Sequence, residues 1–254
     1  MSFPLGAAAA ARLDVVPRTG STNADLRDHA DDPEGWPHLS TLLTRHQTAG
    51  RGRLDRTWEA PDGAALAISV LLRRVPTETA ARGWIPLVAG VAMAEAVEAQ
   101  LPGHDVAVKW PNDVLVDGLK ICGVLAEATT DAVIVGAGVN TDMTARQLPV
   151  PTATSFATMG AKADEDRLLA DYLRGLERYI SSLAAAEEAM TSGVHAVVTA
   201  RCATLGRTVR VTMPSGDTIE GVASALDPEG RLRVSTGSGE RAISAGDVVH
   251  VRPA

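Results

Sequence analysis

The sequence predicts an α+β protein in which a sheet packed against helices is followed by a small all-β unit. Apolar runs of strand length recur along the chain, at residues 13–16, 39–47, 64–72 and 132–139. Two longer stretches, residues 83–99 and 164–183, carry apolar side chains at helical spacing. After Gly206 only short strands and turns remain, so we expect the chain to end in a separate β unit.

The N-terminal segment, residues 1–11, contains an alanine run but no basic residue. Secretory signals begin with basic residues, and we therefore predict a loose tail on a cytoplasmic protein. Residues 13–16 form the first predicted strand and lead into a turn at Gly20. Thr22 and Asp25 fit a capping box, which predicts a helix through about His29.

A hairpin is predicted around Asp117-Gly118, a dipeptide typical of tight turns between strands. Val106, Val108 and Trp110 alternate toward one face of the strand before the turn. Polar side chains interrupt these apolar strands at Lys109, Asn112, Asp113 and Lys120. Charged groups in such surroundings need partners, which favours a functional site. An ion pair between Lys109 and Asp113 remains open as a purely structural explanation.

The helix predicted at residues 164–183 presents one apolar stripe, made by Leu169, Leu173, Leu176, Ile180 and Leu183. A further helix is expected at about residues 187–204. Turns at residues 214–216, 227–230 and 237–239 then separate short strands, which predicts a small β-barrel or sandwich.

Composition limits the class of protein. The chain has 254 residues, 45% of them hydrophobic, and a formal net charge of -7, which argues against a general nucleic-acid binder. The apolar run at residues 64–72 is too short for a membrane span of roughly 18 residues. Cys122 and Cys202 are the only cysteines and stand far apart, so neither a disulfide framework nor a zinc site is expected.

Three guanidinium groups lie close together in residues 50–58, which we call the arginine loop. Arg51, Arg53 and Arg56 stand in this loop with Gly50 and Gly52. Arginine matches the geometry of phosphate and carboxylate groups, and glycine allows the backbone to approach a ligand closely. In an acidic protein this cluster indicates an anion site, with a nucleotide as the first candidate. A solvated basic loop remains the alternative.

Five segments of the chain together resemble the signature of biotin protein ligases. They are Gly20-Ser21-Thr22-Asn23, Gly50-Arg51-Gly52-Arg53-x-x-Arg56-x-Trp58, Lys109-Trp110-Pro111-Asn112-Asp113, Lys120-x-x-Gly123-Val124-Leu125-x-Glu127 and Gly136-Ala137-Gly138-Val139-Asn140. The segments occur in the order of the family and cover most of residues 13–252. The resemblance implies the class II synthetase-like biotin/lipoate ligase fold, with a mixed, mainly antiparallel central sheet and a C-terminal SH3-like β-barrel.

This resemblance also implies a domain organisation and a reaction. Residues 12–204 would form the catalytic domain that binds biotin and ATP, and residues 205–254 the small β-barrel domain. The enzyme, a biotin-[acetyl-CoA-carboxylase] ligase, would form biotinyl-5'-AMP and pyrophosphate with Mg²⁺ as cofactor. It would then transfer biotin to a lysine of the biotin carboxyl carrier domain of an acyl-CoA carboxylase. Neither a DNA-binding domain nor a membrane contact is expected.

Two other functions share part of the pattern. A lipoate- or octanoate-protein ligase would use the same fold and the same acyl-adenylate chemistry. A non-catalytic biotin sensor would bind biotin in the same pocket without catalysing a reaction. The presence of Lys120, Arg53 and Asp113 argues against a sensor.

The resemblance assigns roles to individual residues. The expected catalytic residues are Lys120, between the biotin carboxylate and the α-phosphate, Arg53, and Asp113, which is also the candidate Mg²⁺ ligand. Biotin contacts are expected from Ser21, Thr22, Asn23, Gln47, Gly50, Arg51, Lys120 and Gly123. Contacts to ATP or the adenylate are expected from Arg53, Arg56, Trp58, Asn112, Lys120 and Asn140. Trp58 would stack on adenine or, equally, anchor the core.

The chain departs from the family pattern at two positions. Asp55 replaces a common glycine in the arginine loop, and Cys122 stands where glycine or alanine is usual. Neither change removes an expected catalytic group. The length and glycine content of the arginine loop predict that it is mobile without ligand and becomes ordered over the adenylate.

Overall fold

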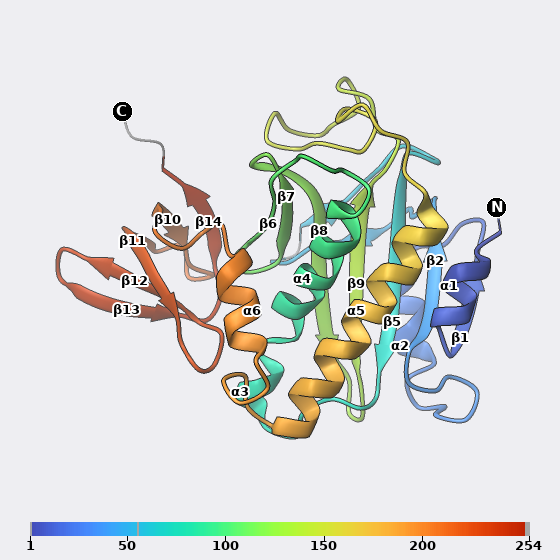
Figure 1. Cartoon of the computed structure of the whole chain (residues 1–254), viewed down its shortest axis with the longest axis horizontal. Helices are drawn as coiled ribbons and strands as arrows, with labels where there is room; N and C mark the ends of the chain where they lie inside the picture. Colours follow the sequence, from blue (N-terminus) through green and yellow to red (C-terminus); the bar gives the residue numbers. More distant parts are fainter. Residues whose placement is uncertain (1, 55, 252–254) are drawn as a thin grey trace.

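A seven-stranded sheet forms the centre of the molecule in the computed structural model, which describes residues 2–54 and 56–251. Its strands are β1 (Arg12–Val15), β2 (Ser40–Thr44), β5 (Ala65–Leu72), β6 (Val106–Lys109), β7 (Asp113–Val116), β8 (Leu119–Ala128) and β9 (Val133–Asn140). The spatial order is β1-β2-β5-β9-β8-β7-β6 (Figure 1). Only β1 and β2 pair in parallel, which confirms the mixed, mainly antiparallel sheet.

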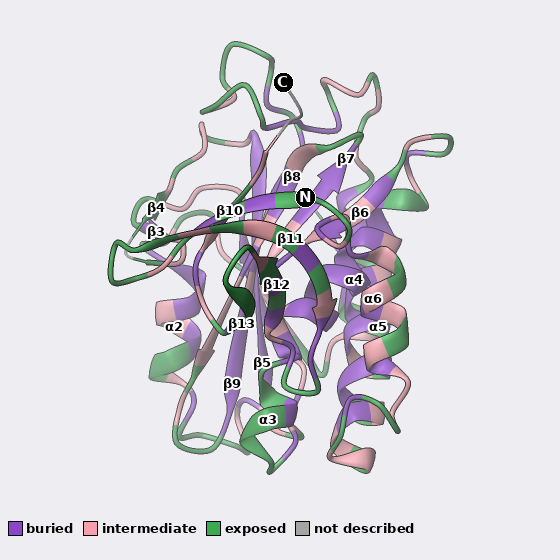
Figure 2. Ribbon diagram, turned by 90° about the vertical axis from the view of Figure 1, so that its left-hand side faces the viewer, coloured by how far each residue is buried: buried purple, intermediate pink, exposed green. Residues whose placement is uncertain are grey.

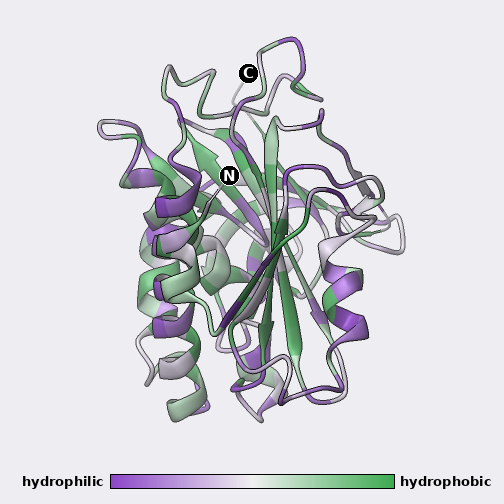
Figure 3. Cartoon of the chain, turned by 90° about the vertical axis from the view of Figure 1, so that its right-hand side faces the viewer, coloured by the Kyte–Doolittle hydropathy of each residue, from purple (hydrophilic) through white to green (hydrophobic). Residues whose placement is uncertain are grey.

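Helices cover both faces of this sheet (Figure 2). Helices α4 (Ile85–Glu98) and α5 (Glu165–Ala186) pack together on one face, and α2 (Thr22–Asp28) covers the other. The leucine-rich stripe expected on α5 is fully buried, as the 3.6-residue period predicts. Apolar residues concentrate along the central strands, whereas the helices are polar on their outer faces (Figure 3).

One segment has the length and hydropathy of a membrane span. It runs over Thr79–Glu98, which comprises the short helix α3 (Thr79–Arg82) and α4. Most of the apolar window, 72%, is buried inside the protein. Because α4 lies between the sheet and α5, its apolar surface is that of a core helix.

The C-terminal unit is a five-stranded antiparallel sheet with the order β13-β12-β11-β10-β14. Its strands are β10 (Thr208–Thr212), β11 (Thr218–Leu226), β12 (Leu232–Thr236), β13 (Gly239–Ile243) and β14 (Asp247–His250). Over the described residues these strands pair as one antiparallel sheet with β13 and β14 at its edges, which confirms the predicted all-β unit.

Three sequence-based expectations require correction. Residues 4–9 are not a loose tail but form helix α1 (Pro4–Ala9), because Asp166 of α5 accepts hydrogen bonds from the backbone N–H groups of Leu5 and Gly6. The helix expected at residues 187–204 is shorter, α6 (Val194–Arg201), and Gly193 precedes it in a left-handed conformation. Helix α2 is capped by Ser21, whose side chain accepts from the N–H of Ala24, rather than by a Thr22 capping box.

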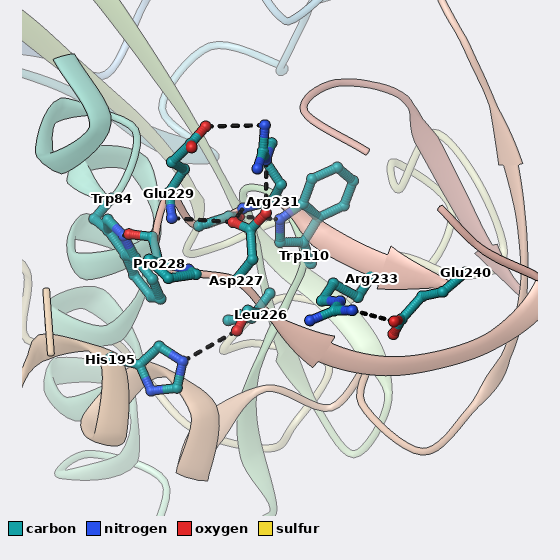
Figure 4. A network of polar contacts seen from close by, with 11 residues as sticks. Trp84, Trp110, His195, Leu226, Asp227, Pro228, Glu229, Arg231, Arg233 and Glu240 are labelled. Carbon is teal, nitrogen blue, oxygen red and sulfur yellow. Dashed lines mark hydrogen bonds and ion pairs between the residues drawn. The ribbon is translucent and has the colours of Figure 1, made fainter. Parts of the chain in front are cut away.

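Two tryptophans, one at the start of α4 and one directly after β6, join the main body of the protein to the C-terminal unit (Figure 4). The Trp84 indole donates a hydrogen bond to the carbonyl of Pro228 at 2.8 Å, and the Trp110 indole donates to that of Gly230 at 3.0 Å. Both rings are buried. Asp227 accepts from the backbone N–H groups of Glu229 and Arg231, and thereby holds the carbonyls of this loop in place. The two units therefore pack through a specific polar contact as well as through apolar surface.

Candidate active site

A pocket enclosing about 950 Å³, its open mouth included, lies where the arginine loop crosses β8 and β9. The loop is a narrow hairpin in which β3 (Gly50–Arg51) pairs with β4 (Thr57–Trp58). Its side chains face the polar residues of the β7–β8 hairpin across the pocket. The start of β14 in the C-terminal unit completes the wall. Segments far apart in the sequence thus meet at a single site.

Two glycines without side chains form the floor of the pocket. A Cβ atom on Gly136 would lie 2.4 Å from Asn23 Oδ1, and one on Gly138 would lie 2.5 Å from the Trp58 ring. Both glycines are on β9, two residues apart, and so they face the same side of the sheet. Trp58 therefore packs directly on the backbone of the strand. The alternatives of ligand stacking and core anchoring are both compatible with this position.

A network of neutral polar groups lies at one end of the pocket. Gln47 Oε1 accepts hydrogen bonds from the backbone N–H of Thr22 at 2.9 Å and from its hydroxyl at 3.1 Å. Ser69 Oγ donates to Asn23 Oδ1 at 2.6 Å, and Asn23 Nδ2 donates to Glu127 Oε2 at 2.6 Å. Ser69 and Glu127 were not among the predicted site residues. Their contacts fix the orientation of the predicted ones.

Each guanidinium of the arginine loop has a different protein partner. Arg51 lies 3.5 Å from Glu127 Oε1, and Arg53 donates to Asn112 Oδ1 at 3.2 Å. Arg56 forms two hydrogen bonds to Asp247, at 2.8 and 3.3 Å. Burial lowers the pKa of Arg53, although Asp113 and Asp247 oppose that effect. These three contacts attach the described part of the loop to the rest of the protein.

Glu127 remains ionised between these groups. Its partial burial favours the protonated form, but hydrogen bonds from Asn23 and Arg27 and the charges of Arg27 and Arg51 hold its pKa below the usual value. Since the same carboxylate contacts Asn23 and lies beside Arg51, it connects the neutral network with the arginine loop.

Lys120 and Asp113 form an ion pair at the centre of the pocket, with Nζ 2.6 Å from Oδ1. They are brought together because β7 and β8 pair with a register shift between Val114 and Leu115. Gly123 lies beneath them, where a Cβ atom would be 3.0 Å from Lys120 Nζ. Cys122 points into the core, and burial raises the pKa of its thiol to about 12. The cysteine at this position, where the family usually has glycine or alanine, therefore does not alter the pocket.

The structure gathers most of the predicted site residues around the pocket. Those that line it are Ser21, Thr22, Asn23, Gln47, Arg51, Arg53, Arg56, Trp58, Asn112, Asp113, Lys120 and Gly123. Gly50, the first residue of the loop, is instead buried against Trp58 and Gln47. Asn140 is buried and donates to the carbonyl of Thr154, so in this structure it is a structural residue rather than a pocket contact. Asp55 lies outside the described residues.

Two protein-family models match the chain, one in each of its two units. Residues 15–140 match the biotin/lipoate A/B protein ligase family, and residues 204–251 match the biotin protein ligase C-terminal domain. The biotin-[acetyl-CoA-carboxylase] ligase of Mycobacterium tuberculosis is 39% identical over 244 residues, which cover 95% of this chain and 90% of that protein. The chain belongs to the biotin protein ligase family.

Two further biotin protein ligase relatives support the assignment. The bifunctional ligase/repressor BirA of Bacillus subtilis is 28% identical over 92% of this chain and 72% of its own length. The structure of the Aquifex aeolicus biotin protein ligase in complex with biotin and ATP superposes with a TM-score of 0.74 at 25% identity, covering 96% of this chain and 100% of that one. The first family match ends with β9, and the second spans the C-terminal sheet.

Proposed function

We propose that this biotin protein ligase activates biotin with ATP and then transfers it to a lysine of a biotin carboxyl carrier domain. The observation that carries the proposal is one pocket with a neutral polar network at one end and a cluster of cations at the other. The ureido group of biotin both donates and accepts hydrogen bonds, which suits the Thr22, Gln47 and Asn23 end. The triphosphate of ATP suits the arginine and lysine end.

In the first step, a carboxylate oxygen of biotin attacks the α-phosphorus of ATP. A new P–O bond forms, the bond to the β-phosphate breaks, and pyrophosphate leaves with the electron pair. Lys120 would lie between the two reacting anions, offset their repulsion and stabilise the charge that develops in the transition state. Arg53 and Arg56 would hold the phosphates, and Arg51 would hold the biotin side of the loop in place.

We infer that Asp113, which lines the pocket, would hold Mg²⁺. No group of three or more metal-ligating side chains occurs among the described residues, so the protein offers no complete cage. This fits Mg²⁺ that arrives with ATP, since Mg²⁺ is commonly held by one or two carboxylates together with substrate phosphates. The ion would neutralise phosphate charge, and Asp113 would additionally orient Lys120 through their ion pair.

In the second step, the amine of the acceptor lysine attacks the carbonyl carbon of biotinyl-5'-AMP. The C–N bond forms, the C–O bond to AMP breaks, and the amine loses a proton. We infer that the acceptor is the biotin carboxyl carrier domain of an acyl-CoA carboxylase and that the reaction takes place in the cytoplasm. The carboxylase named in the description of the mycobacterial relative supports this acceptor.

The experiment that tests the proposal is exchange of labelled pyrophosphate into ATP, with biotin, lipoate and octanoate compared in parallel. We expect exchange with biotin alone. Lys120→Ala should reduce it by about 10²-fold or more, because removal of one preorganised charge-stabilising group has effects of that size. Lys162→Ala, a change at an exposed lysine outside the pocket, is the matched control and should leave the rate unchanged.

Each other result identifies an alternative. Faster exchange with lipoate or octanoate would make the protein a lipoate- or octanoate-protein ligase. Tight biotin binding without any exchange would make it a sensor. If Lys120→Ala exchanged pyrophosphate at the wild-type rate, Lys120 would have no part in the catalytic step.

A further inference from the structure

The C-terminal sheet contributes one carboxylate to the pocket, that of Asp247 at the start of β14. The position of this residue is tightly defined. Asp247 pairs with Thr212 of β10, and the preceding Gly246 lies so close to β10 that a Cβ atom would be 2.6 Å from Val211 Cγ1. The carboxylate is therefore attached to a regular strand rather than to a flexible loop.

Asp247 meets Arg56 in the geometry that a phosphate would use. Arg56 donates from both terminal nitrogens, one to each carboxylate oxygen, at 3.3 and 2.8 Å. A planar guanidinium binds a phosphate through the same pair of parallel hydrogen bonds. The face of Arg56 that could receive a nucleotide phosphate is thus occupied by a side chain of the protein itself.

The surroundings of Asp247 are strongly cationic. Its pKa is held below the usual range first by the hydrogen bond from Arg56, and further by the charges of Arg56, Lys109 and Arg53. Lys109 and Arg53 also line the pocket. Asp247 therefore neutralises part of the same cation cluster that ATP must engage, and a triphosphate in the pocket would be repelled by it.

The pair is also weak enough to be displaced. The Arg56 side chain is 60% exposed and that of Asp247 is 40% exposed. Exposed ion pairs contribute little to stability, and their partners exchange readily. A triphosphate carries more charge than one carboxylate, so it competes successfully for the guanidinium.

We propose that Asp247 is a positioning residue of the nucleotide site, which holds Arg56 through a phosphate-like contact until ATP displaces it. The C-terminal unit thereby sets the affinity of the enzyme for ATP and fixes the arginine loop while the site is empty. This inference rests on the proposed adenylation reaction, and it adds to that reaction a residue from the second unit.

The test compares Asp247→Asn with the wild-type chain in three measurements. Trypsin without ligand should cleave the arginine loop faster in the variant, because the neutral amide offers Arg56 only one acceptor oxygen and no charge, and so holds it less strongly. Calorimetric titration with inorganic pyrophosphate should show roughly two- to fivefold tighter binding, the scale of one exposed charge interaction. In pyrophosphate exchange the KM for ATP should fall by a similar factor, while kcat and the KM for biotin stay unchanged.

Two further variants separate this role from a general effect of charge. Glu220→Gln removes a carboxylate that pairs with Arg210 at 2.9 Å in the same sheet, at comparable exposure, and it should change none of the three measurements. Asp247→Glu keeps the charge and should keep the wild-type affinity for pyrophosphate.

Equal trypsin cleavage and equal pyrophosphate affinity in Asp247→Asn and wild type would overturn the proposal, as would a higher KM for ATP in the variant. The trypsin and pyrophosphate measurements require neither biotin nor turnover. An inactive wild-type enzyme would therefore count against the proposed function alone.

Discussion

Gly138 shows how a single residue determines the shape of the pocket. Its missing side chain leaves the space in which the Trp58 ring lies, and the nearest ring atom would be 2.5 Å from an added Cβ atom. In the middle of a strand, glycine lowers stability by roughly 0.5–1 kcal/mol relative to alanine. The strand is therefore less stable at the position where the Trp58 ring approaches the backbone.

Gly138→Ala should displace Trp58 and reduce kcat/KM for ATP by about tenfold or more, because small misplacements at a reacting centre have large effects. The melting temperature should change little, since the gain in strand stability offsets the lost ring contact. The measurements are pyrophosphate exchange at varied ATP and thermal unfolding. Gly237→Ala is the control, because an added Cβ atom there has no neighbour within 4 Å. An unchanged KM and kcat for ATP in Gly138→Ala would show that Trp58 has no part in nucleotide binding.

At the same scale, sequence reasoning located Lys120 and Asp113 because their hairpin is local and its turn residues are explicit. It could not locate Asp247, which pairs with a residue 191 positions away and belongs to no recognised motif. It also placed Asn140 in the pocket, whereas its amide bonds the carbonyl of Thr154. The direction of a side chain at the end of a strand depends on the loop packed against it, and the sequence pattern contains no information on that loop.

At the scale of elements, the long periodic segments were predicted well. The expected helix at residues 164–183 corresponds to α5 and the expected strand at residues 64–72 to β5, each within a few residues. Helix α1 was missed because nothing within its own six residues caps it. The cap is Asp166, which is supplied by α5 about 160 residues later.

Asp166→Ala should release α1 from α5. Loss of a capping carboxylate costs about 1 kcal/mol, and the effect should remain confined to the first turn of α1 and its contact with α5. Amide hydrogen exchange is the measurement, and faster exchange is expected at Leu5 and Gly6. Asp171→Ala on the same helix removes only surface ion pairs with Arg167 and Arg174, and should leave α1 protected. Unchanged protection of α1 in Asp166→Ala would contradict the assigned cap.

At the scale of the whole molecule, the two units pack as one body. The indoles of Trp84 and Trp110 both donate to carbonyls of the loop at residues 227–231 (Figure 4). A buried carbonyl that loses its donor costs about 1–3 kcal/mol. The units should therefore unfold in a single transition, and damage at this contact should destabilise both.

Trp84→Phe tests this expectation without touching the adenylation pocket. We expect one calorimetric transition at a melting temperature several degrees lower, since about 1 kcal/mol corresponds to roughly 2–4 °C in a chain of this size. Trp36→Phe is the comparison variant, because within the part of the chain that is described Trp36 forms hydrogen bonds only through its backbone, while its ring stacks on His29 and lies beneath the Arg12 guanidinium. It should lower the melting temperature less. Two separate transitions in Trp84→Phe, with only one of them shifted, would show that the units fold independently.

Strand β9 has consequences for how this enzyme can change over evolutionary time. Val135, Ala137 and Val139 belong to the apolar core, whereas Gly136 and Gly138, between them, face Asn23 and Trp58. Consecutive residues of this strand therefore alternate between packing the core and shaping the pocket. Substitutions at Val135 and Val139 can adjust thermal tolerance while the ligand cavity keeps its outline, whereas substitutions at Gly136 and Gly138 reshape the cavity. Ala137 belongs to the core and also lines the pocket, so a change there affects both. Apart from Ala137, stability and substrate choice are in this way separable within a span of five residues.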